Sequence, residues 1–270
     1  MVVEEPQTQH KNTAYHNSLE KALPAIQLYN HNFNGSGSPE ISVIMPAFNE
    51  ERAVGHLLDR TQKALLKITP NYEIIVVDDG SHDQTLDICR EKHVTIIHNP
   101  YNWGKGYALR EGFKQAHGDF IITMDSDGDH NPEDIPLLLQ PLRAGKIEAV
   151  FGSRFMDNRN SPVTTVVNTF GNRLFNFLIR NLTNRKFTDT QCGFRAFNRN
   201  CLSTLQLNSQ GYDIETEMIV QLARQHTPYC EIPVRSPITY LRKSNINRLK
   251  DGFRILFSIF KARVRTLAKT

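Results

Sequence analysis

Five short apolar runs, each followed by a polar segment or a helical pattern, constrain the fold of this chain more than any other feature. The runs are Ile41–Phe48, Tyr72–Val77, Val94–Ile97, Phe120–Met124 and Ala149–Phe151. Helical periodicity covers about residues 51–67, 84–92, 105–117 and 132–144 between them. Strands that alternate with helices in this way are typical of a parallel sheet with right-handed crossovers. The sequence therefore predicts an α/β domain with a mostly parallel sheet flanked by helices.

The fourth apolar run ends in three carboxylates at alternate positions, Asp125, Asp127 and Asp129. If strand geometry continues through them, the three side chains project to one face and repel each other unless a cation lies between them. Oxygen ligands suit Mg²⁺ or Mn²⁺, and substrate phosphates usually complete the shell of these ions. We therefore expect a divalent metal and a phosphorylated substrate. The alternative is a solvated acidic turn before the next helix.

Other common ligand loops do not fit the sequence. A calcium loop of the D-x-D-x-D-G form would have glycine at its sixth position and glutamate at its twelfth, where this chain has His130 and Pro136. The dinucleotide pattern lacks its third glycine after Gly104-Lys105-Gly106, and no phosphate loop of the G-x-x-x-x-G-K-[ST] type is present. The sequence thus argues against a calcium loop, a dehydrogenase and a P-loop enzyme.

Polar residues gather where the predicted strands end. They are Asn49-Glu50, Asp78–Ser81, Asp125–Asp127 and Gly152–Arg154. Open α/β sheets bind their ligands at the carboxyl ends of the strands, and neighbouring strands lie about 4.8 Å apart. These loops are therefore expected to surround one ligand of the size of a nucleotide.

Composition limits the remaining possibilities. The chain has 270 residues, of which 39% are hydrophobic, and a net charge of +4, which is too small to indicate nucleic-acid binding. No apolar stretch is long enough to cross a bilayer, and residues 1–39 lack the apolar block of a secretory signal. The four cysteines show no C-x-x-C spacing, which favours reduced thiols in the cytoplasm over a zinc site.

The chain is expected to divide into three parts. Residues 1–39 form a flexible polar segment with a short helix at about 19–28, residues 40–245 form the catalytic domain, and residues 246–270 form a basic amphipathic helix. This last helix and a second amphipathic stretch, residues 165–182, are predicted to contact a membrane surface or to line the approach of a lipid. Docking onto the domain, or onto a membrane-anchoring subunit, is the alternative.

Five motifs, taken in order, resemble those of family 2 inverting glycosyltransferases with the GT-A, Rossmann-like fold. They are Val43–Glu50, Val76–Ser81, Asn102–Gly106, Met124–Asp127 and Gly152–Arg154. The runs Thr188–Phe197 and Gly211–Glu215 narrow the resemblance to dolichyl- and polyprenyl-phosphate sugar synthases. The resemblance covers about residues 40–249, and the Q-x-x-R-W motif of processive synthases is absent.

The resemblance implies a set of residues that bind the donor. Pro46, Phe48, Glu50, Val77 and Asp79 would line the pocket for base and ribose, Lys105 and Arg242 would reach the phosphates, and Asp125, Ser126 and Asp127 would hold the diphosphate and its metal, with Asp129 as a third ligand. For Pro46 and Val77, packing at the strand end is an equal alternative. For Asp79 and Glu50, the alternatives are a turn-forming and a helix-capping role.

It also implies an acceptor side. Arg154, Arg173, Lys243 and Ser244 would bind the acceptor phosphate, while Asp127, Arg154 and Asp189 would be the catalytic residues. Asp189 would orient the sugar, or serve as the base if the acceptor were a hydroxyl; a loop-capping role is the alternative. Glu215 is interpreted as a carboxylate that complements the dipole of a helix start.

The function implied is metal-dependent, inverting transfer of a hexose from GDP-mannose or a UDP-sugar to dolichyl or another polyprenyl phosphate. The protein would be peripheral on the cytoplasmic face of a membrane. Two alternatives remain open. One is a soluble family 2 glycosyltransferase with a small phosphorylated or hydroxyl acceptor, and the other is a non-catalytic membrane scaffold that binds nucleotide sugars.

Overall fold

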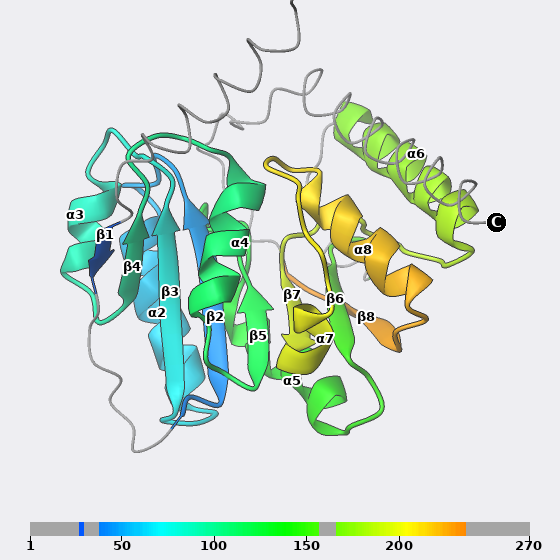
Figure 1. Ribbon diagram of the computed structural model, residues 1–270, viewed down its shortest axis with the longest axis horizontal. Helices are drawn as coiled ribbons and strands as arrows, with labels where there is room; N and C mark the ends of the chain where they lie inside the picture. Colours follow the sequence, from blue (N-terminus) through cyan, green and yellow to red (C-terminus); the bar gives the residue numbers. More distant parts are fainter. Residues whose placement is uncertain (1–26, 30–37, 157–165, 236–270) are drawn as a thin grey trace, which may run out of the picture.

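The computed structural model of the protein describes residues 27–29, 38–156 and 166–235. In this part of the chain, an eight-stranded sheet lies between two layers of helices (Figure 1). The strands are β1 (Gln27–Tyr29), β2 (Ile41–Ala47), β3 (Tyr72–Asp78), β4 (Thr95–His98), β5 (Phe120–Thr123), β6 (Ala149–Ser153), β7 (Arg195–Asn198) and β8 (Tyr229–Pro233). The helices are α2 (Val54–Leu66), α3 (Thr85–Arg90), α4 (Lys105–Gln115), the 3₁₀ turn η1 (Pro132–Asp134), α5 (Ile135–Arg143), α6 (Val166–Thr183), α7 (Arg199–Ser203) and α8 (Ile214–Arg224).

The sheet has the order β1-β4-β3-β2-β5-β7-β6-β8. Strands β2 to β5 are parallel where they pair, and β6 is parallel to β8. Strand β7 is antiparallel to both of its neighbours, β5 and β6, so β6 runs in the same direction as β5. The predicted α/β fold with a mostly parallel sheet is confirmed. The carboxyl ends of β2, β3, β5 and β6 meet at one edge, although β7 separates β6 from the others.

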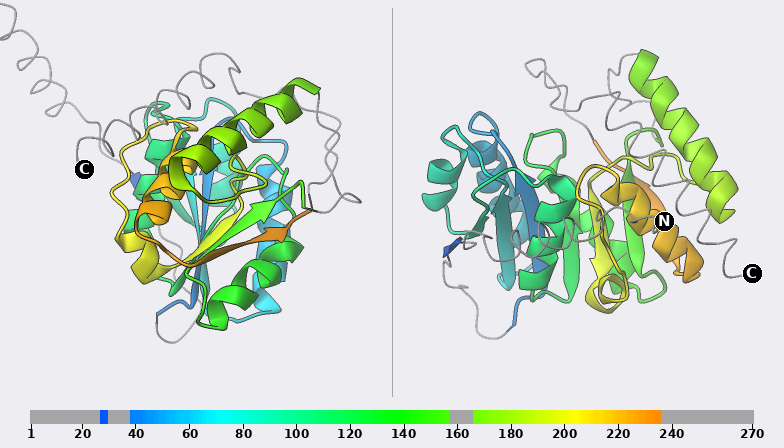
Figure 2. Two further views of the ribbon diagram at one scale, coloured as in Figure 1. Left: turned by 90° about the vertical axis from the view of Figure 1, so that its right-hand side faces the viewer. Right: turned by 45° about the horizontal axis from the view of Figure 1, so that its top comes forward.

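Alternating side chains of the central strands form two cores, one on each face of the sheet. Val43 and Met45 of β2 pack with α2, α3 and α5, while Ile44 packs with α4, α7 and α8 on the other face. Figure 2 shows the two helical layers from other directions. Strands buried on both faces explain the continuous apolar runs in the sequence.

The predicted element boundaries hold to within a few residues, with one exception at the start. Gln27 and Leu28 lie in β1, which pairs antiparallel with β4 at the edge of the sheet. The helix expected at about 19–28 is therefore wrong at these two residues, and this part of the segment that was expected to be flexible is paired. Residues 19–26 lie outside the described residues.

The strand geometry expected through the acidic triplet is also wrong. Strand β5 ends at Thr123, and the following residues turn, with Gly128 at a φ of 84°. A positive φ suits glycine because it lacks a Cβ atom. The three carboxylates are therefore not fixed on one face by a common strand.

The predicted amphipathic stretch at 165–182 forms α6. In the described part of this helix, Leu174 and Phe177 are among the exposed large hydrophobic side chains. The tail helix predicted at 246–270 lies outside the described residues. A membrane-spanning helix is not found among the described elements, since none combines the necessary length with the necessary apolarity.

Candidate active site

The centre of the candidate site is an ion-pair cluster around Lys105, the first residue of α4. Its Nζ lies 2.6 Å from Asp125 Oδ1 and 2.6 Å from Glu215 Oε1. The second oxygen of Asp125 lies 3.4 Å from Nε2 of His130, which is buried and stacks on Phe194. Asp125 follows β5 and Glu215 is the second residue of α8, so one ammonium joins two segments far apart in the sequence.

Neighbouring charges fix the ionisation of Asp125 and Lys105. Burial alone would raise the pKa of Asp125, but Lys105 and then His130 outweigh it and hold that pKa well below its usual range. Burial would likewise lower the pKa of Lys105, but Asp125 and Glu215 raise it above the ordinary value. Asp125 is therefore a carboxylate and Lys105 an ammonium at neutral pH.

Two glycines of the predicted motifs allow this cluster to form. A Cβ atom on Gly193 would lie 2.7 Å from both carboxylate oxygens of Asp125. The Gly193 carbonyl also accepts a hydrogen bond of 2.7 Å from the Thr123 hydroxyl. At the start of α4, a Cβ atom on Gly106 would clash with the carbonyl oxygen of Ser209, and the N–H of Gly106 donates to the carbonyl of Gln210 at 2.7 Å. The loop before α8 thus closes on the start of α4, and the loop before β7 closes on Asp125.

The predicted metal ligands, Asp125, Asp127 and Asp129, do not form a preorganised metal site. The backbone N–H of Asp129 donates to Asp127 Oδ1 at 3.0 Å, as expected in a turn. Among residues 27–29, 38–156 and 166–235, no three His, Cys, Asp or Glu side chains are grouped so that they could hold a metal ion. Their chemistry still fits Mg²⁺ or Mn²⁺, which needs only one or two carboxylates beside substrate phosphates. The Lys105 ammonium already stands as a cation between Asp125 and Glu215.

Asp79, predicted to line the nucleoside pocket or to form a turn, anchors a loop in the structure. Its side chain is buried and accepts hydrogen bonds from Asn99 Nδ2 at 2.9 Å and from the backbone N–H groups of Trp103 and Gly104 at 3.1 and 2.7 Å. Burial raises the pKa of Asp79, although these three donors oppose the shift. Asp79 therefore anchors the loop that leads into α4, and both of its oxygens accept hydrogen bonds there.

The other residues expected around the nucleoside separate into two groups. Val77 is fully buried in the core, which favours packing over ligand contact at this position. The Ser126 hydroxyl donates to the Pro46 carbonyl at 2.7 Å and ties the ends of β5 and β2 together. Phe48 is half-buried beside the ring of His82, and the backbone N–H of Glu50 donates to Thr85 Oγ1. Phe48 and Glu50 therefore remain candidates for a nucleoside pocket.

Arg154 and Asp189, both predicted to be catalytic, bind each other. Arg154 Nε donates to Asp189 Oδ2 at 2.7 Å, and Nη2 donates to Oδ1 at 3.1 Å. The Asp189 side chain is 0% exposed, so in this arrangement it cannot take a proton from an acceptor hydroxyl. Arg154 is 24% exposed, and two of its five N–H donors go to Asp189. Any phosphate would have to be bound by the remaining donors.

Two residues that support the site were not predicted for this role. Arg195, in β7, is 1% exposed and donates to the backbone carbonyls of Cys192, Glu215 and Thr190 at 2.8 to 2.9 Å. It thus fixes both the loop behind Asp125 and the first turn of α8. The burial of Glu215 had a signal in the sequence, because Glu215 shares the i, i+3, i+4, i+7 face of Met218, Ile219 and Leu222.

Several residues predicted to bind the donor or acceptor phosphates cannot be placed. Arg173 lies on α6, but its side chain is outside the described part of the structure, and Arg242, Lys243 and Ser244 lie outside the described residues. Of the residues predicted to bind the acceptor phosphate, Arg154 is the one whose side chain is described. The adjacent Glu231 of β8 accepts hydrogen bonds from the N–H groups of Thr188 and Asp189 and so positions the partner of Arg154.

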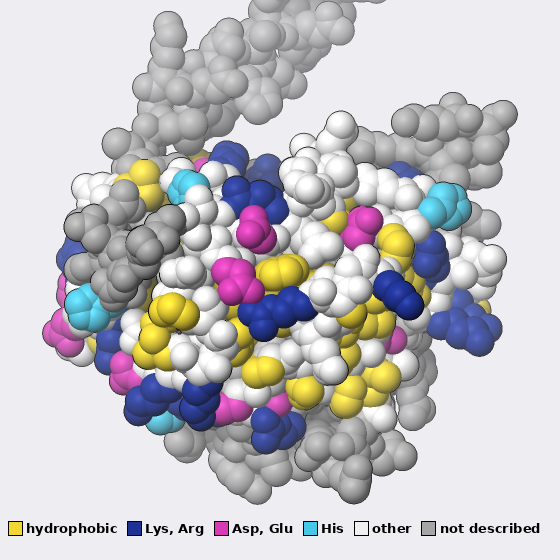
Figure 3. Space-filling view, turned by 90° about the horizontal axis from the view of Figure 1, so that it is seen from below, with side chains coloured by type: hydrophobic (Ala, Val, Ile, Leu, Met, Phe, Trp, Pro, Cys, Tyr) yellow, Lys and Arg dark blue, Asp and Glu magenta, His cyan; other side chains and the backbone are white. Residues whose placement is uncertain are grey.

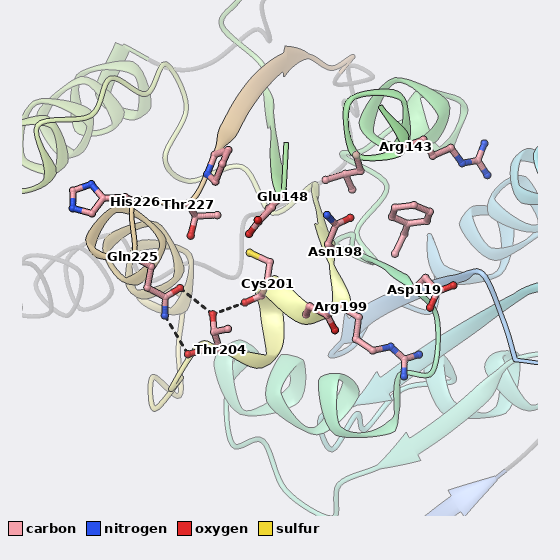
Figure 4. A pocket seen from close by; sticks show the side chains of 14 residues that line it. Asp119, Arg143, Glu148, Asn198, Arg199, Cys201, Thr204, Gln225, His226 and Thr227 are labelled. Atoms are coloured by element: carbon pink, nitrogen blue, oxygen red, sulfur yellow. Dashed lines mark hydrogen bonds between the residues drawn. The ribbon is translucent and has the colours of Figure 1, made fainter. Parts of the chain in front are cut away.

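A large groove of about 910 Å³ lies at the opposite edge of the sheet, where β5 and β6 begin. Figure 4 shows its lining, in which Gln225 and Thr204 are hydrogen-bonded to each other. Figure 3 views this edge from below and shows charged side chains of both signs interspersed with hydrophobic ones. None of the predicted site residues lines the groove, so the candidate site is the carboxyl edge.

Known proteins resemble the chain in both sequence and structure. The family model described as Glycosyl transferase family 2 matches residues 42–205. A UDP-N-acetylglucosamine–dolichyl-phosphate N-acetylglucosaminyltransferase of Methanococcus voltae is 30% identical over 245 residues, which cover 81% of this chain and 94% of the relative. An undecaprenyl-phosphate 4-deoxy-4-formamido-L-arabinose transferase of Photorhabdus laumondii is 33% identical over 172 residues, 62% of this chain and 51% of the relative. The matched region thus spans about half of that second relative.

Among solved structures, glucosyl-3-phosphoglycerate synthase from Mycobacterium tuberculosis, in complex with UDP, is similar with a TM-score of 0.68 and 22% sequence identity. The similarity covers 83% of this chain and 80% of that one. The same enzyme in complex with Mn²⁺, UDP and phosphoglyceric acid also has a TM-score of 0.68, at 19% identity. At these identities the likeness concerns the fold.

Proposed function

The chain belongs to glycosyl transferase family 2 and is a glycosyltransferase, and from this premise we propose that it transfers a hexose from a nucleotide diphosphate sugar to a polyprenyl phosphate such as dolichyl phosphate. The observation that carries the proposal is the ionised Asp125 at the end of β5, held at the carboxyl edge of the sheet beside Lys105. This is the edge at which α/β sheets bind nucleotides.

The nucleotide-sugar donor would be bound by predicted residues that lie at the carboxyl edge of the sheet. Phe48 and Glu50 offer an apolar wall and a carboxylate for base and ribose. Asp125 and Asp127, with Asp129 as a further contributor, would hold Mg²⁺ or Mn²⁺ against the diphosphate. When bound, the metal would offset negative charge on the leaving diphosphate. A UDP-sugar is the first donor to test, because UDP is named for a relative and for similar structures.

The reaction needs no general base when the acceptor is a phosphate. Its oxygen already carries negative charge near neutral pH and forms a bond to the anomeric carbon directly. The bond from that carbon to the nucleoside diphosphate breaks, and the diphosphate leaves with the electron pair. One such displacement inverts the anomeric centre. The buried position of Asp189 agrees with this scheme, because no proton has to be removed by it.

On the acceptor side, Arg154 is the proposed phosphate ligand. Its guanidinium is held in place by Asp189 through two hydrogen bonds, which leaves a fixed cationic group at the end of β6. A guanidinium that is oriented before the acceptor arrives loses little side-chain freedom on binding. Arg173, Lys243 and Ser244 remain proposed contributors to the same phosphate.

The proposed location is the surface of a membrane, where the lipid acceptor resides. The names of relatives that act on dolichyl or undecaprenyl phosphate support this proposal. The basic residues between 246 and 270 would bind anionic headgroups, and the exposed Leu174 and Phe177 of α6 would face the lipid. We propose a peripheral position on the cytoplasmic face.

Mass spectrometry of the products tests the function. The full chain would be incubated with Mn²⁺, polyprenyl phosphate and a panel of UDP- and GDP-sugars, and the lipid extract analysed. A new lipid with the added mass of one hexose or N-acetylhexosamine is expected. Transfer to phosphoglycerate or to a glycan without any glycosylated lipid would favour the soluble alternative, which only the fold-level likeness supports. Donor binding without transfer to any acceptor would favour a scaffold.

A further inference from the structure

Lys105 is held in place both near its backbone and at its side chain. The N–H groups of Gly106 and Tyr107 donate to the Gln210 carbonyl, which holds the start of α4 against the loop before α8. The Lys105 side chain is 11% exposed and its ammonium also lies 5.4 Å from the centre of the Tyr212 ring. The backbone of Lys105 therefore cannot shift without opening this loop, and only its flexible side chain can move.

Glu215 is fixed more firmly than Asp125. Its side chain is 4% exposed, against 27% for Asp125, and its backbone carbonyl accepts a hydrogen bond of 2.8 Å from the buried Arg195. Asp125 lies in a turn at the edge of the sheet, which is where the diphosphate is proposed to bind. Of the two carboxylates that share Lys105, one is therefore open to a ligand and the other is enclosed.

A divalent cation on Asp125 would compete with Lys105. The ammonium is 2.6 Å from Asp125 Oδ1, and a metal on that carboxylate would place two cations side by side. Like charges at such a distance repel strongly in a partly buried site. The ammonium must then give up Asp125, and Glu215, already 2.6 Å from it, is the carboxylate that keeps it.

We propose that Lys105 is a built-in competitor for the metal at Asp125 and that Glu215 is a positioning residue which retains the ammonium when the metal binds. This inference rests on the proposed function, because it requires a divalent cation at Asp125. It gives Glu215 a role that acts through Lys105, and it makes the two residues affect metal affinity in opposite directions.

The test measures the affinity of the full-length, metal-free protein for Mn²⁺ alone, by electron paramagnetic resonance of the unbound ion. Lys105→Met removes the competitor and should tighten Mn²⁺ binding by about tenfold or more, the size expected for one charge within about 4–6 Å. Glu215→Gln leaves Lys105 with Asp125 as its single carboxylate and should weaken binding by about tenfold. Lys114→Met and Glu111→Gln alter an ion pair on the same helix, away from the site, and should leave the affinity unchanged.

Two results would overturn the inference. If Lys105→Met and Glu215→Gln change the affinity in the same direction, or not at all, the residues have a merely structural role. If Glu215→Gln does not fold, as judged by circular dichroism, the comparison of Lys105→Met with Lys105→Arg decides, because only the neutral variant should bind Mn²⁺ more tightly. Failure of the unaltered protein to bind Mn²⁺, even with UDP, would instead reject the proposed metal site, and the inference with it.

Discussion

The guanidinium of Arg154 and the carboxylate of Asp189 form a bidentate ion pair, with Nε 2.7 Å from Oδ2 and Nη2 3.1 Å from Oδ1. Asp189 also accepts the backbone N–H of Arg154 at 3.2 Å. The pair joins the end of β6 to the loop before β7, so two residues expected to act separately on the substrate form one unit. Asp189 fixes the orientation of the Arg154 guanidinium.

Replacement of Arg154 should therefore lower the stability of the fold as well as the rate of glycosyl transfer. Arg154→Ala leaves the fully buried Asp189 carboxylate without its cation, and removal of one partner of such a pair costs about 3 kcal/mol or more of unfolding free energy. Urea unfolding followed by circular dichroism measures this. Arg90→Ala, which breaks an exposed pair with Asp87, should cost less than about 1 kcal/mol. Equal effects of the two substitutions would contradict the account.

The contact of Gly193 with Asp125 leads to a second prediction. Gly193→Ala places a methyl group 2.7 Å from both carboxylate oxygens, so Asp125 must leave the position in which it pairs with Lys105. A displacement of about 1 Å can lower a rate by roughly a hundredfold, and we expect a loss of glycosyl transfer of that order. Gly145→Ala is the control: its φ of 77° makes the substitution cost stability, but nothing lies within 4 Å of the added atom, so transfer by the folded protein should not change. An unchanged transfer rate in Gly193→Ala would count against Asp125 as a site residue.

Asp79 leads to a prediction about pH. Because burial raises its pKa, the folded state holds the proton more tightly than the unfolded chain does, where the pKa is about 4. As pH rises through the interval above about 4, the unfolded state ionises first and the protein loses stability relative to an Asp79→Asn variant. Urea unfolding of both proteins at pH values between about 3.5 and 6.5, in steps of about half a pH unit, measures the difference in their free energies of unfolding. If the unaltered protein instead gained stability over Asp79→Asn as pH rises, the pKa of Asp79 would be lowered, which would contradict the prediction.

Membrane attachment through the tail is the subject of a fourth prediction. Arg248, Lys250, Arg254, Lys261 and Arg263 belong to the basic face of the predicted tail helix. Each contributes about 1 kcal/mol at an anionic surface, so replacing all five with glutamine should abolish flotation with vesicles that contain phosphatidylserine. High salt should have the same effect on the unaltered protein. Retention on neutral vesicles by the variant would indicate that the apolar face, or a partner, is responsible.

The fold was largely predictable because the central strands are buried on both faces. Runs such as Ile74–Val77 are short and rich in β-branched residues, which favours a strand covered on both faces, and the helices between them show clear periodicity. The short strands β7 and β8 gave no comparable signal. β7 begins with Arg195, a residue that is rarely buried, and its burial depends on three backbone carbonyls supplied by distant segments.

The sequence singled out residues of the candidate site but did not indicate their partners. The sequence identified Asp125, Lys105, Arg154 and Asp189 separately, each as a group that would touch the substrate. Their pairing depends on how segments that are 20 or more residues apart in the sequence meet, which no local pattern encodes. Glu215 was interpreted as a dipole-facing carboxylate, because a first-turn position has that role in most helices.

Calorimetry of nucleotide binding tests the central claim most directly, that Asp125 and Asp127 hold a divalent cation against the diphosphate of the donor. UDP and GDP would be titrated into the protein with Mn²⁺, into the same mixture with EDTA, and into a folded Asp125→Asn, Asp127→Asn variant. We predict that one of the two nucleotides binds with Mn²⁺ and that both EDTA and the double substitution weaken it by about a hundredfold or more. Binding of equal strength in all three samples would contradict the account.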